Sequence, residues 1–129
     1  MLDRIEVGLV SADDAVVNFY TTVFEMDKLE VTEAGSGTVH RLRAGGTVLK
    51  VMVPKQPPAV AEPSGSFLAA TGLRYLSFYV ADGLDELVER GVAAGGRLQM
   101  GPIDIGPGKR LAIFADPDGN TLELVEGPS

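Results

Sequence analysis

Hydrophobic residues follow two successive periodicities in the first half of the chain. Residues 4–10 largely alternate between apolar and polar positions, which predicts a short strand. A helical stripe follows, made of Val16, Phe19, Tyr20 and Val23. Three further strand-like runs, separated by glycines, lie at about 28–33, 38–43 and 47–53. The first half is therefore predicted to fold as a strand, a helix and three strands.

The second half repeats this order. Residues 73–80 predict a strand, and Gly95 and Gly96 end the helix that follows it. The stripe of that helix consists of Leu84, Leu87, Val88 and Val92. The last three strand-like runs lie at about 97–100, 109–115 and 120–126. Each half thus predicts one βαβββ module.

Both predicted helices have a polar residue where the helix is expected to begin. Ser11 precedes Asp14 with the spacing of a capping box, and Asp82 stands in the same relation to Asp85. We therefore expect Ser11 and Asp82 to cap the two helices.

The two halves also match residue by residue, as expected of a duplicated unit. A shift of 69 places Glu6 on Tyr75, and a shift of 73 places Lys50 on Glu123. A stretch with four prolines, residues 54–66, separates the halves. We therefore expect residues 1–129 to form a single domain. Its expected parts are module 1 at about 2–54, a Pro-rich linker at 55–71 and module 2 at about 72–127.

Composition narrows the functions that are open to this chain. Its net charge of −7 repels phosphate backbones and anionic lipids, so we expect no nucleic-acid partner. The sequence has no cysteine, and its single histidine is His40, which excludes thiolate metal sites and sites with two histidines. His40 has no acid near it in sequence and is expected to be a surface or hydrogen-bonded residue.

No segment predicts a membrane association. The longest stretch without a charged residue, residues 63–73, is far shorter than the ~20 residues of a spanning helix. Charged residues close to the N-terminus argue against a signal peptide, so we expect a cytoplasmic location and no membrane partner.

Two motifs carry a resemblance to a known family. Asn18-Phe19-Tyr20 lies in the first predicted helix, and residues 114–124 are Phe-Ala-Asp-Pro-Asp-Gly-Asn-Thr-Leu-Glu-Leu. An Asp-Pro-Asp-Gly turn alone is common, but here it precedes Asn-Thr-Leu-Glu-Leu in a duplicated unit. In these features, and over almost the whole chain outside the linker, the sequence resembles the vicinal oxygen chelate superfamily. That group includes glyoxalase I, bleomycin-resistance proteins and extradiol dioxygenases.

The resemblance implies an α+β fold of two tandem βαβββ modules whose curved mixed sheets enclose a cavity. It also implies that the family's metal-ligand positions are occupied here by Glu6, Lys50, Tyr75 and Glu123. An ammonium has no lone pair to donate, and tyrosine is a poor ligand for zinc, nickel or magnesium. We therefore expect no metal and no other cofactor. The alternative is a weak oxygen site formed by Glu6 and Glu123.

Strand alternation predicts which residues line the cavity. If the uniformly apolar face of each strand packs on a helix, the other face is left for a ligand. The substrate-binding residues expected on it are Val10, Val48, Met52, Ser77, Tyr79 and Val125. Apolar walls with a few polar groups are typical of a small-molecule pocket. The competing interpretation is that the polar residues of these strands simply face water.

Two functions fit these residues. The first is a metal-independent enzyme that acts on a small carbonyl compound by acid/base chemistry, as an isomerase, epimerase or lyase. In it Glu123 is the base, Lys50 an electrostatic stabiliser and Tyr75 a proton or hydrogen-bond donor, while Glu6 is a second acid/base or the partner of Lys50. The second is a non-catalytic protein that sequesters an antibiotic-like molecule. The ionisable groups favour the enzyme, and a homodimer is expected because related proteins of this size pair.

Overall fold

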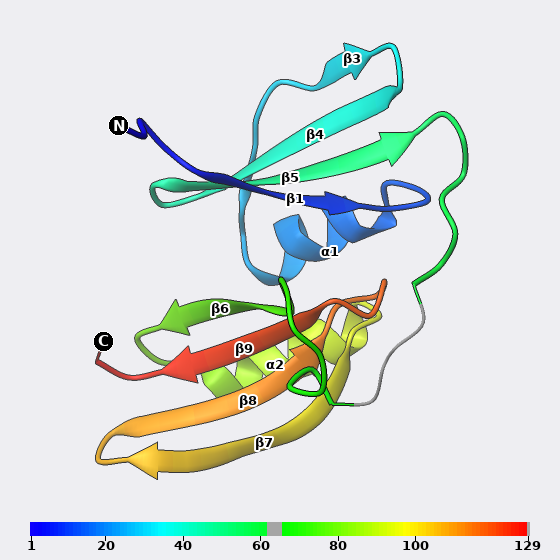
Figure 1. Ribbon diagram of the computed structural model, residues 1–129. Coiled ribbons are helices and arrows are strands. Elements are labelled where there is room, and N and C mark those ends of the chain that lie inside the picture. Colours follow the sequence, from blue (N-terminus) through cyan, green and yellow to red (C-terminus); the bar gives the residue numbers. More distant parts are fainter. Residues whose placement is uncertain (62–65, 129) are drawn as a thin grey trace. The chain divides into compact units, whose positions relative to one another are not determined.

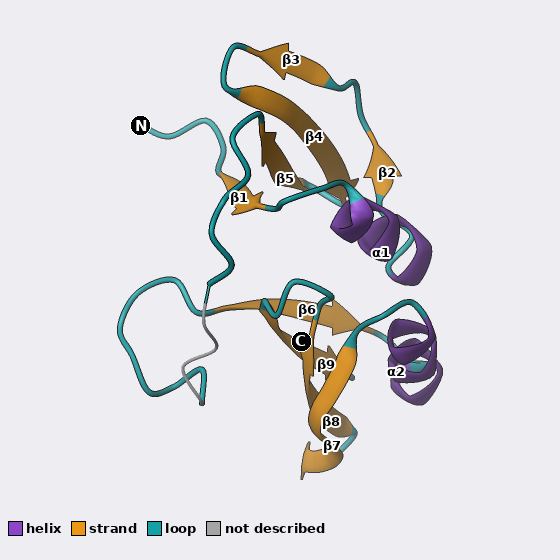
Figure 2. Ribbon diagram, turned by 90° about the vertical axis from the view of Figure 1, so that its right-hand side faces the viewer, coloured by secondary structure: helices purple, strands orange, loops and turns teal. Residues whose placement is uncertain are grey.

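The computed structural model describes residues 1–61 and 66–128, and the chain divides into two compact units, Met1–Ala61 and Glu62–Ser129. Each unit contains one helix that lies along one side of a mixed β-sheet (Figures 1 and 2). This confirms the expected α+β fold of two βαβββ modules. Both sheets are open. Part of the expected linker, residues 62–65, lies outside the described residues.

The first unit is built on a parallel pair of strands with antiparallel neighbours. Its elements are β1 (Glu6–Val10), α1 (Ala15–Val23), β2 (Asp27–Lys28), β3 (Thr32–Ala34), β4 (Gly37–Ala44) and β5 (Thr47–Pro54). The sheet order is β1-β5-β4-β2, and β3 also pairs with β4. β1 and β5 are parallel. The single strand expected at 28–33 is divided into β2 and β3.

The second unit repeats this plan. Its elements are β6 (Tyr75–Val80), α2 (Leu84–Ala93), β7 (Arg97–Gly106), β8 (Lys109–Ala115) and β9 (Thr121–Glu126). The sheet order is β6-β9-β8-β7, with β6 parallel to β9. β7 continues well beyond the strand expected at 97–100. The β7–β8 pair has register shifts on both sides of Met100, and the strand continues through Gly101 and Pro102 to Gly106.

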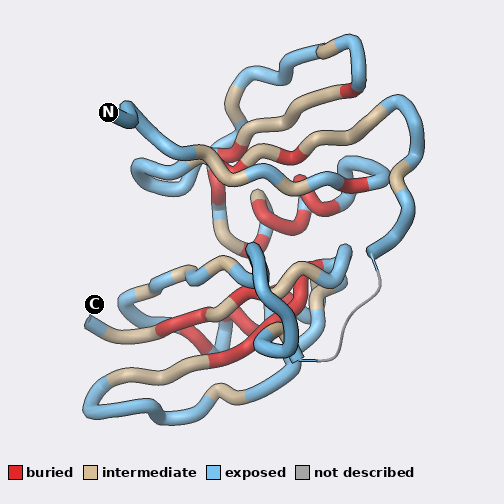
Figure 3. Tube along the Cα trace, viewed as in Figure 1, coloured by how far each residue is buried: buried red, intermediate tan, exposed pale blue. Residues whose placement is uncertain are grey.

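The apolar face of each sheet is the buried one. Figure 3 shows where the buried residues lie along the chain of each unit. In the first unit Leu42, Leu49 and Val51 are buried together with the apolar stripe of α1. In the second unit the corresponding buried residues are Phe114, Leu122 and Leu124, together with Leu84, Leu87 and Val88 of α2. Alternate residues on the same strands therefore lie on the opposite, open face.

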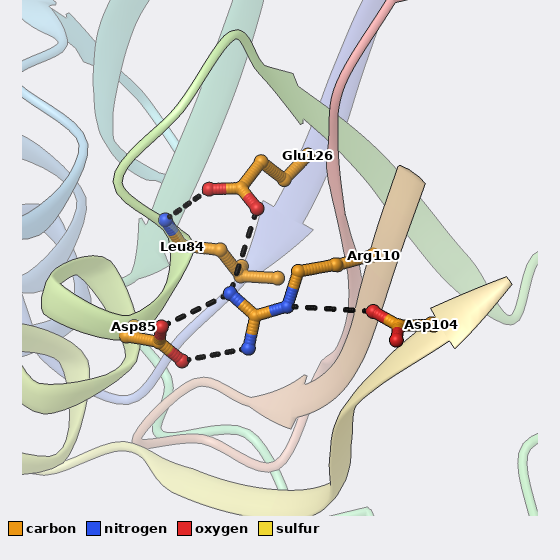
Figure 4. A network of polar contacts seen from close by, with 5 residues as sticks. All are labelled: Leu84, Asp85, Asp104, Arg110 and Glu126. Carbon is orange, nitrogen blue, oxygen red and sulfur yellow. Dashed lines mark hydrogen bonds and ion pairs between the residues drawn. The ribbon is translucent and has the colours of Figure 1, made fainter. Parts of the chain in front are cut away.

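The expected helix caps are wrong. α1 has Asp14 as its N-cap, and the side chain of Asp13 accepts the N–H of Ala15 at 2.9 Å. α2 has Gly83 at its N-cap, in a left-handed conformation with φ of 81°. The free N–H of Leu84 is instead accepted by the carboxylate of Glu126 at 3.0 Å, so the end of β9 supplies the cap (Figure 4).

Arg110 of β8 ties the start of α2 to the sheet (Figure 4). Its guanidinium makes two hydrogen bonds to Asp85, at 2.9 and 3.0 Å, and lies 3.5 Å from Glu126 and 4.0 Å from Asp104. The hydrogen bonds from Arg110 hold the pKa of the Asp85 carboxyl below its ordinary value of 3.8. α2, β7, β8 and β9 thus share one polar network. In the described part of the chain, neither helix is long and apolar enough to cross a membrane.

Replacing Gly91 of α2 by alanine is expected to destabilise the fold by about 2 kcal/mol, the cost of overpacking a filled core. A Cβ at this position would lie 2.6 Å from Cζ of Phe114, whose ring is buried. Helix propensity alone predicts the opposite sign, since alanine is favoured over glycine by about 1 kcal/mol. The free energy of unfolding, measured with urea, distinguishes destabilisation by overpacking from stabilisation by helix propensity.

The matched control is Gly46→Ala, because a Cβ at Gly46 meets no atom within 4 Å. Its effect is expected to stay within about 0.5 kcal/mol. Combining Gly91→Ala with Phe114→Leu should cost less than the sum of the two single changes, because the smaller side chain makes room for the methyl group. A stabilised Gly91→Ala variant would contradict the packing of α2 on Phe114.

Candidate functional site

The open face of the first sheet carries a group of charged residues. Strand pairing places Gly8 of β1 beside Lys50 of β5, and Arg41 of β4 on its other side. Side chains of paired residues point to the same face of a sheet, and every second residue shares it. The face defined in this way also includes Glu6, Val10, Val39, Arg43, Val48 and Met52.

Two arginines hold the carboxylate of Glu6. Arg41 donates from Nε to Oε1 at 3.2 Å and from Nη2 to Oε2 at 2.6 Å, and Arg4 donates to Oε2 at 2.8 Å. These hydrogen bonds, the one from Arg41 first, keep the pKa of Glu6 below its ordinary value of 4.5. The Glu6 side chain is 13% exposed. Glu6 is therefore an anion that fixes Arg41 in place, and it is a poor proton acceptor near neutral pH.

Lys50 has no such partner. Within the first unit, residues 1–61, no carboxylate lies within ion-pair distance of its ammonium. Within the first unit, Glu6 therefore pairs with Arg41 and Arg4 instead of Lys50. Sequence reasoning missed both arginines. The register of β4 with β5 sets Arg41 opposite Lys50, and knowing that register would have revealed Arg41.

The open face of the second sheet carries a different set. Ser77 and Glu123 are paired across β6 and β9, and Ser77 Oγ donates to Glu123 Oε1 at 2.9 Å. Tyr75 and Tyr79 lie on the same strand face and are 49% and 62% exposed. The ring of Phe67 packs edge-on against Tyr75, with centroids 5.1 Å apart. Val125, expected to line the pocket, is only 5% exposed and offers little surface to a ligand.

The structure therefore groups the expected site residues by unit. The first sheet brings together Glu6, Lys50, Val10, Val48 and Met52, and the second brings together Tyr75, Ser77, Tyr79, Glu123 and Val125. That the two groups line one cavity stays a prediction. His40 pairs with buried Val51, on the face opposite Lys50, and joins neither group.

The donor atoms at the four family positions do not fit a divalent metal. Both oxygens of Glu6 are engaged by guanidiniums, and Lys50 offers an ammonium. Tyr75 offers a phenol, which leaves Glu123 as the one carboxylate of the set without an arginine. Catalytic metal sites usually need three good protein ligands. We therefore assign no step of the chemistry to a metal.

The arginine contacts of Glu6 predict a specific response to acid. Because its pKa is lower in the folded state, ionised Glu6 stabilises the fold above its ordinary pKa of 4.5, and this contribution is lost as the pH falls through the folded value. Glu6→Gln is expected to be less stable than the wild type at pH 7, and the gap should narrow below pH ~4.5. Urea unfolding at pH 7 and at pH ~3 measures the difference in stability between the wild type and Glu6→Gln.

Exposed Glu30 provides the control for this experiment. Glu30→Gln removes the same charge from the same unit, and it should follow the wild type at both pH values. A constant gap between wild type and Glu6→Gln across this range would contradict the stabilising role of the ionised carboxylate.

Known proteins resemble this chain in sequence and in fold. A glyoxalase family protein from Enterococcus faecalis is 27% identical, with a TM-score of 0.71, over 98% of this chain and 97% of that chain. A glyoxalase family protein from Bacillus cereus is 19% identical, with a TM-score of 0.83, over 100% and 97%. The fosfomycin resistance protein FosX from Listeria monocytogenes is 16% identical, with a TM-score of 0.73, over 99% and 95%. The last two show the fold alone. Among curated proteins no significant match is found.

The family profile described as Glyoxalase/Bleomycin resistance protein/Dioxygenase superfamily matches residues 6–124. This segment runs from the first residue of β1 into β9 and includes both helices. It also contains the helix motif around Phe19 and the Asp-Pro-Asp-Gly turn on which the resemblance was based. The resemblance is therefore confirmed, and the chain belongs to the glyoxalase/bleomycin resistance protein/dioxygenase superfamily.

Proposed function

We propose that this protein is a metal-independent enzyme that moves a proton beside the carbonyl group of a small, partly apolar molecule. The observation that carries the proposal is the carboxylate of Glu123. It lies on the open face of the second sheet, held by Ser77 at 2.9 Å, and no arginine or lysine among the described residues of its own unit pairs with it. A positioned carboxylate without a cationic partner is able to accept a proton.

The reaction class follows from that step. Glu123 takes a proton from the carbon next to the carbonyl. The electron pair of the broken C–H bond forms a C=C bond, and the π pair of the carbonyl moves onto its oxygen, which gives an enolate. Returning the proton to the opposite side gives an epimerase, returning it to another atom gives an isomerase, and loss of a leaving group gives a lyase. The phenol of Tyr75 is a hydrogen-bond donor for the substrate on the same sheet face.

Lys50 is proposed as the electrostatic stabiliser of the enolate oxygen. Its free ammonium supports this role, since it is not neutralised by a carboxylate of its own unit. Lys50 belongs to the first unit and Glu123 to the second, so their joint action is a hypothesis for a double-mutant cycle. Glu6 is assigned the positioning of Arg41 rather than proton transfer.

Proton abstraction is tested directly by isotope exchange. The wild-type protein is incubated in D₂O with a panel of small ketones, 2-oxo acids and 2-hydroxy carbonyl compounds, after dialysis against a chelator. Deuterium uptake at the carbon beside the carbonyl, at a rate above the protein-free control, is the expected result. Compounds that bind, as seen by a raised melting temperature, but never exchange would overturn the enzyme proposal.

The second candidate function is binding without chemistry. The exposed rings of Tyr75 and Tyr79 favour it, because aromatic side chains on an open sheet face provide a stacking surface for a flat ligand. FosX, whose fold is similar, is a fosfomycin resistance protein, so resistance to an antibiotic exists on this scaffold. Binding of antibiotic-like compounds without turnover or isotope exchange is the result that this candidate predicts.

We also propose that the chain forms a homodimer. β7 is an edge strand of its sheet, and exposed apolar side chains lie along it: Leu98, Met100, Ile103 and Ile105. Apolar edge strands that are left uncovered are prone to association. Light scattering at micromolar concentration is expected to give twice the chain mass of 13.6 kDa. A particle of 13.6 kDa would contradict the dimer.

A further inference from the structure

Two cations face each other on the open face of the first sheet. Arg41 and Lys50 are directly paired across β4 and β5, with their side chains on the same side. Like charges opposite one another destabilise a pair of strands, and opposite charges stabilise it. The carboxylate of Glu6 neutralises only part of this charge, because it is shared between Arg41 and Arg4.

The basic cluster formed by Arg4, Arg41, Lys50 and Glu6 therefore has an excess of positive charge. It belongs to a chain whose net charge is −7. The neighbouring Arg43 does not add to the excess, because it lies 3.7 Å from Asp27. A local positive region on an acidic protein concentrates small anions at that point.

Arg41 is also oriented for a second partner. Its contacts to Glu6 use Nε and Nη2, which leaves the two N–H groups of Nη1 without a partner within the first unit, residues 1–61. The Arg41 side chain is 30% exposed. A guanidinium fixed through one edge presents its other nitrogen in a defined direction, which suits recognition of an oxyanion.

Beside Lys50 the sheet surface is open. Gly8 of β1 is the strand neighbour of Lys50 on the side away from Arg41, and it is exposed. A Cβ built at Gly8 would meet no atom within 4 Å. Val10 and Met52 border this space on the same face, two residues further along their strands than Gly8 and Lys50. The cluster thus combines free cationic donors with room for a ligand and an apolar border.

We propose that the space over Gly8 binds an oxyanion of a small ligand, either a carboxylate or a phosphate or phosphonate group, through Arg41 Nη1 and Lys50 Nζ. The ammonium of Lys50 has three N–H donors, so it is able to bind this group and the enolate oxygen together. Glu6 is the positioning residue that fixes Arg41. This deepens the proposed function, on which it rests for the assignment of the ligand as the substrate. The substrate class becomes a small carbonyl compound that also carries an anionic group.

Anion binding is measured without any turnover, so its outcome is separate from that of the isotope exchange. Inorganic phosphate and acetate are titrated at constant ionic strength set with chloride, and the NMR signals of the amides of Gly8 and Lys50 are followed. Saturable shifts with phosphate or acetate, and not with chloride, are expected. A stronger response to phosphate assigns a phosphate or phosphonate, and a stronger response to acetate assigns a carboxylate. Identical responses to all three anions would overturn the proposal.

Lys50→Met removes one of the two donors, and the affinity for the anion is expected to fall about tenfold, the loss of one charge-assisted hydrogen bond. The variant should fold, because the change also removes the repulsion from Arg41. The matched control is Lys28→Met. Lys28 is exposed and pairs with buried Leu42, so it belongs to the opposite face of the same sheet. Equal weakening by both substitutions would contradict a specific site.

Gly8→Asp provides an independent test, because it places a carboxylate in the open space beside Lys50. Compared with its uncharged isostere Gly8→Asn, it should melt at a higher temperature in low salt and should no longer respond to phosphate or acetate. The difference in melting temperature should shrink as salt is added. Gly8→Asp melting no higher than Gly8→Asn in low salt would count against the proposal.

Discussion

Replacing Glu123 by glutamine is expected to slow turnover of the substrate by about 10²–10⁴-fold, the usual contribution of a general base. Glutamine has the same shape, and its amide oxygen still accepts the hydrogen bond that Ser77 now donates at 2.9 Å. It has no basic oxygen to take up the proton. The loss should therefore fall on kcat, while substrate affinity changes little. Steady-state kinetics and a binding titration on the same variant measure the two effects separately.

The control for this experiment is Glu89→Gln. Glu89 is an exposed carboxylate on α2 of the same unit, so the same charge is removed away from the open sheet face. Its kcat should equal that of the wild type. A Glu123→Gln variant with unchanged kcat would remove the base from the proposal, and a loss of affinity alone would favour the binding function. Combining Lys50→Met with Glu123→Gln then shows whether the two residues act on the same step.

The duplication was predictable from the sequence because it depends on local signals. The shifts of 69 and 73 place Gly8 on Ser77 and Lys50 on Glu123. In the structure Gly8 pairs with Lys50, and Ser77 pairs with Glu123. The alternation of apolar residues also identified the buried strand faces, since Leu49, Val51, Leu122 and Leu124 are all buried.

Interactions between distant segments were not predictable in the same way. The carboxylate that caps α2 belongs to Glu126, 42 residues from Leu84, whereas the local capping pattern indicated Asp82. Glu6 meets Arg41 across the intervening strand β5, because both side chains are long enough to reach over it. Sequence periodicity reports the face of a strand but not which strand lies beside it. Predicting the contact between Glu6 and Arg41 would have required the register of β4 with β5.

The Asp-Pro-Asp-Gly turn shows why one family motif is structural. Asp116 is 3% exposed at the end of β8, and its carboxylate closes the turn into β9. Oδ1 accepts the backbone N–H groups of Asp118 and Asn120, at 3.0 and 2.8 Å, and Oδ2 accepts the side-chain amide of Asn120 at 2.8 Å. Gly119 takes a φ of 90°, which favours glycine. This turn sets the start of β9, the strand that carries Glu123.

Asp116→Ala is accordingly expected to destabilise the protein by about 3 kcal/mol, because it leaves several N–H donors of a buried turn without an acceptor. Asp116→Asn should lose less, about 1–2 kcal/mol, since one oxygen remains for the two backbone N–H groups. Urea unfolding followed by circular dichroism gives both values. Asp82→Ala, at an exposed aspartate that caps no helix, should stay within about 0.5 kcal/mol of the wild type. If Asp116→Ala were as stable as this control, the carboxylate would not hold the turn, and another interaction would have to fix the register of β9 and the position of Glu123.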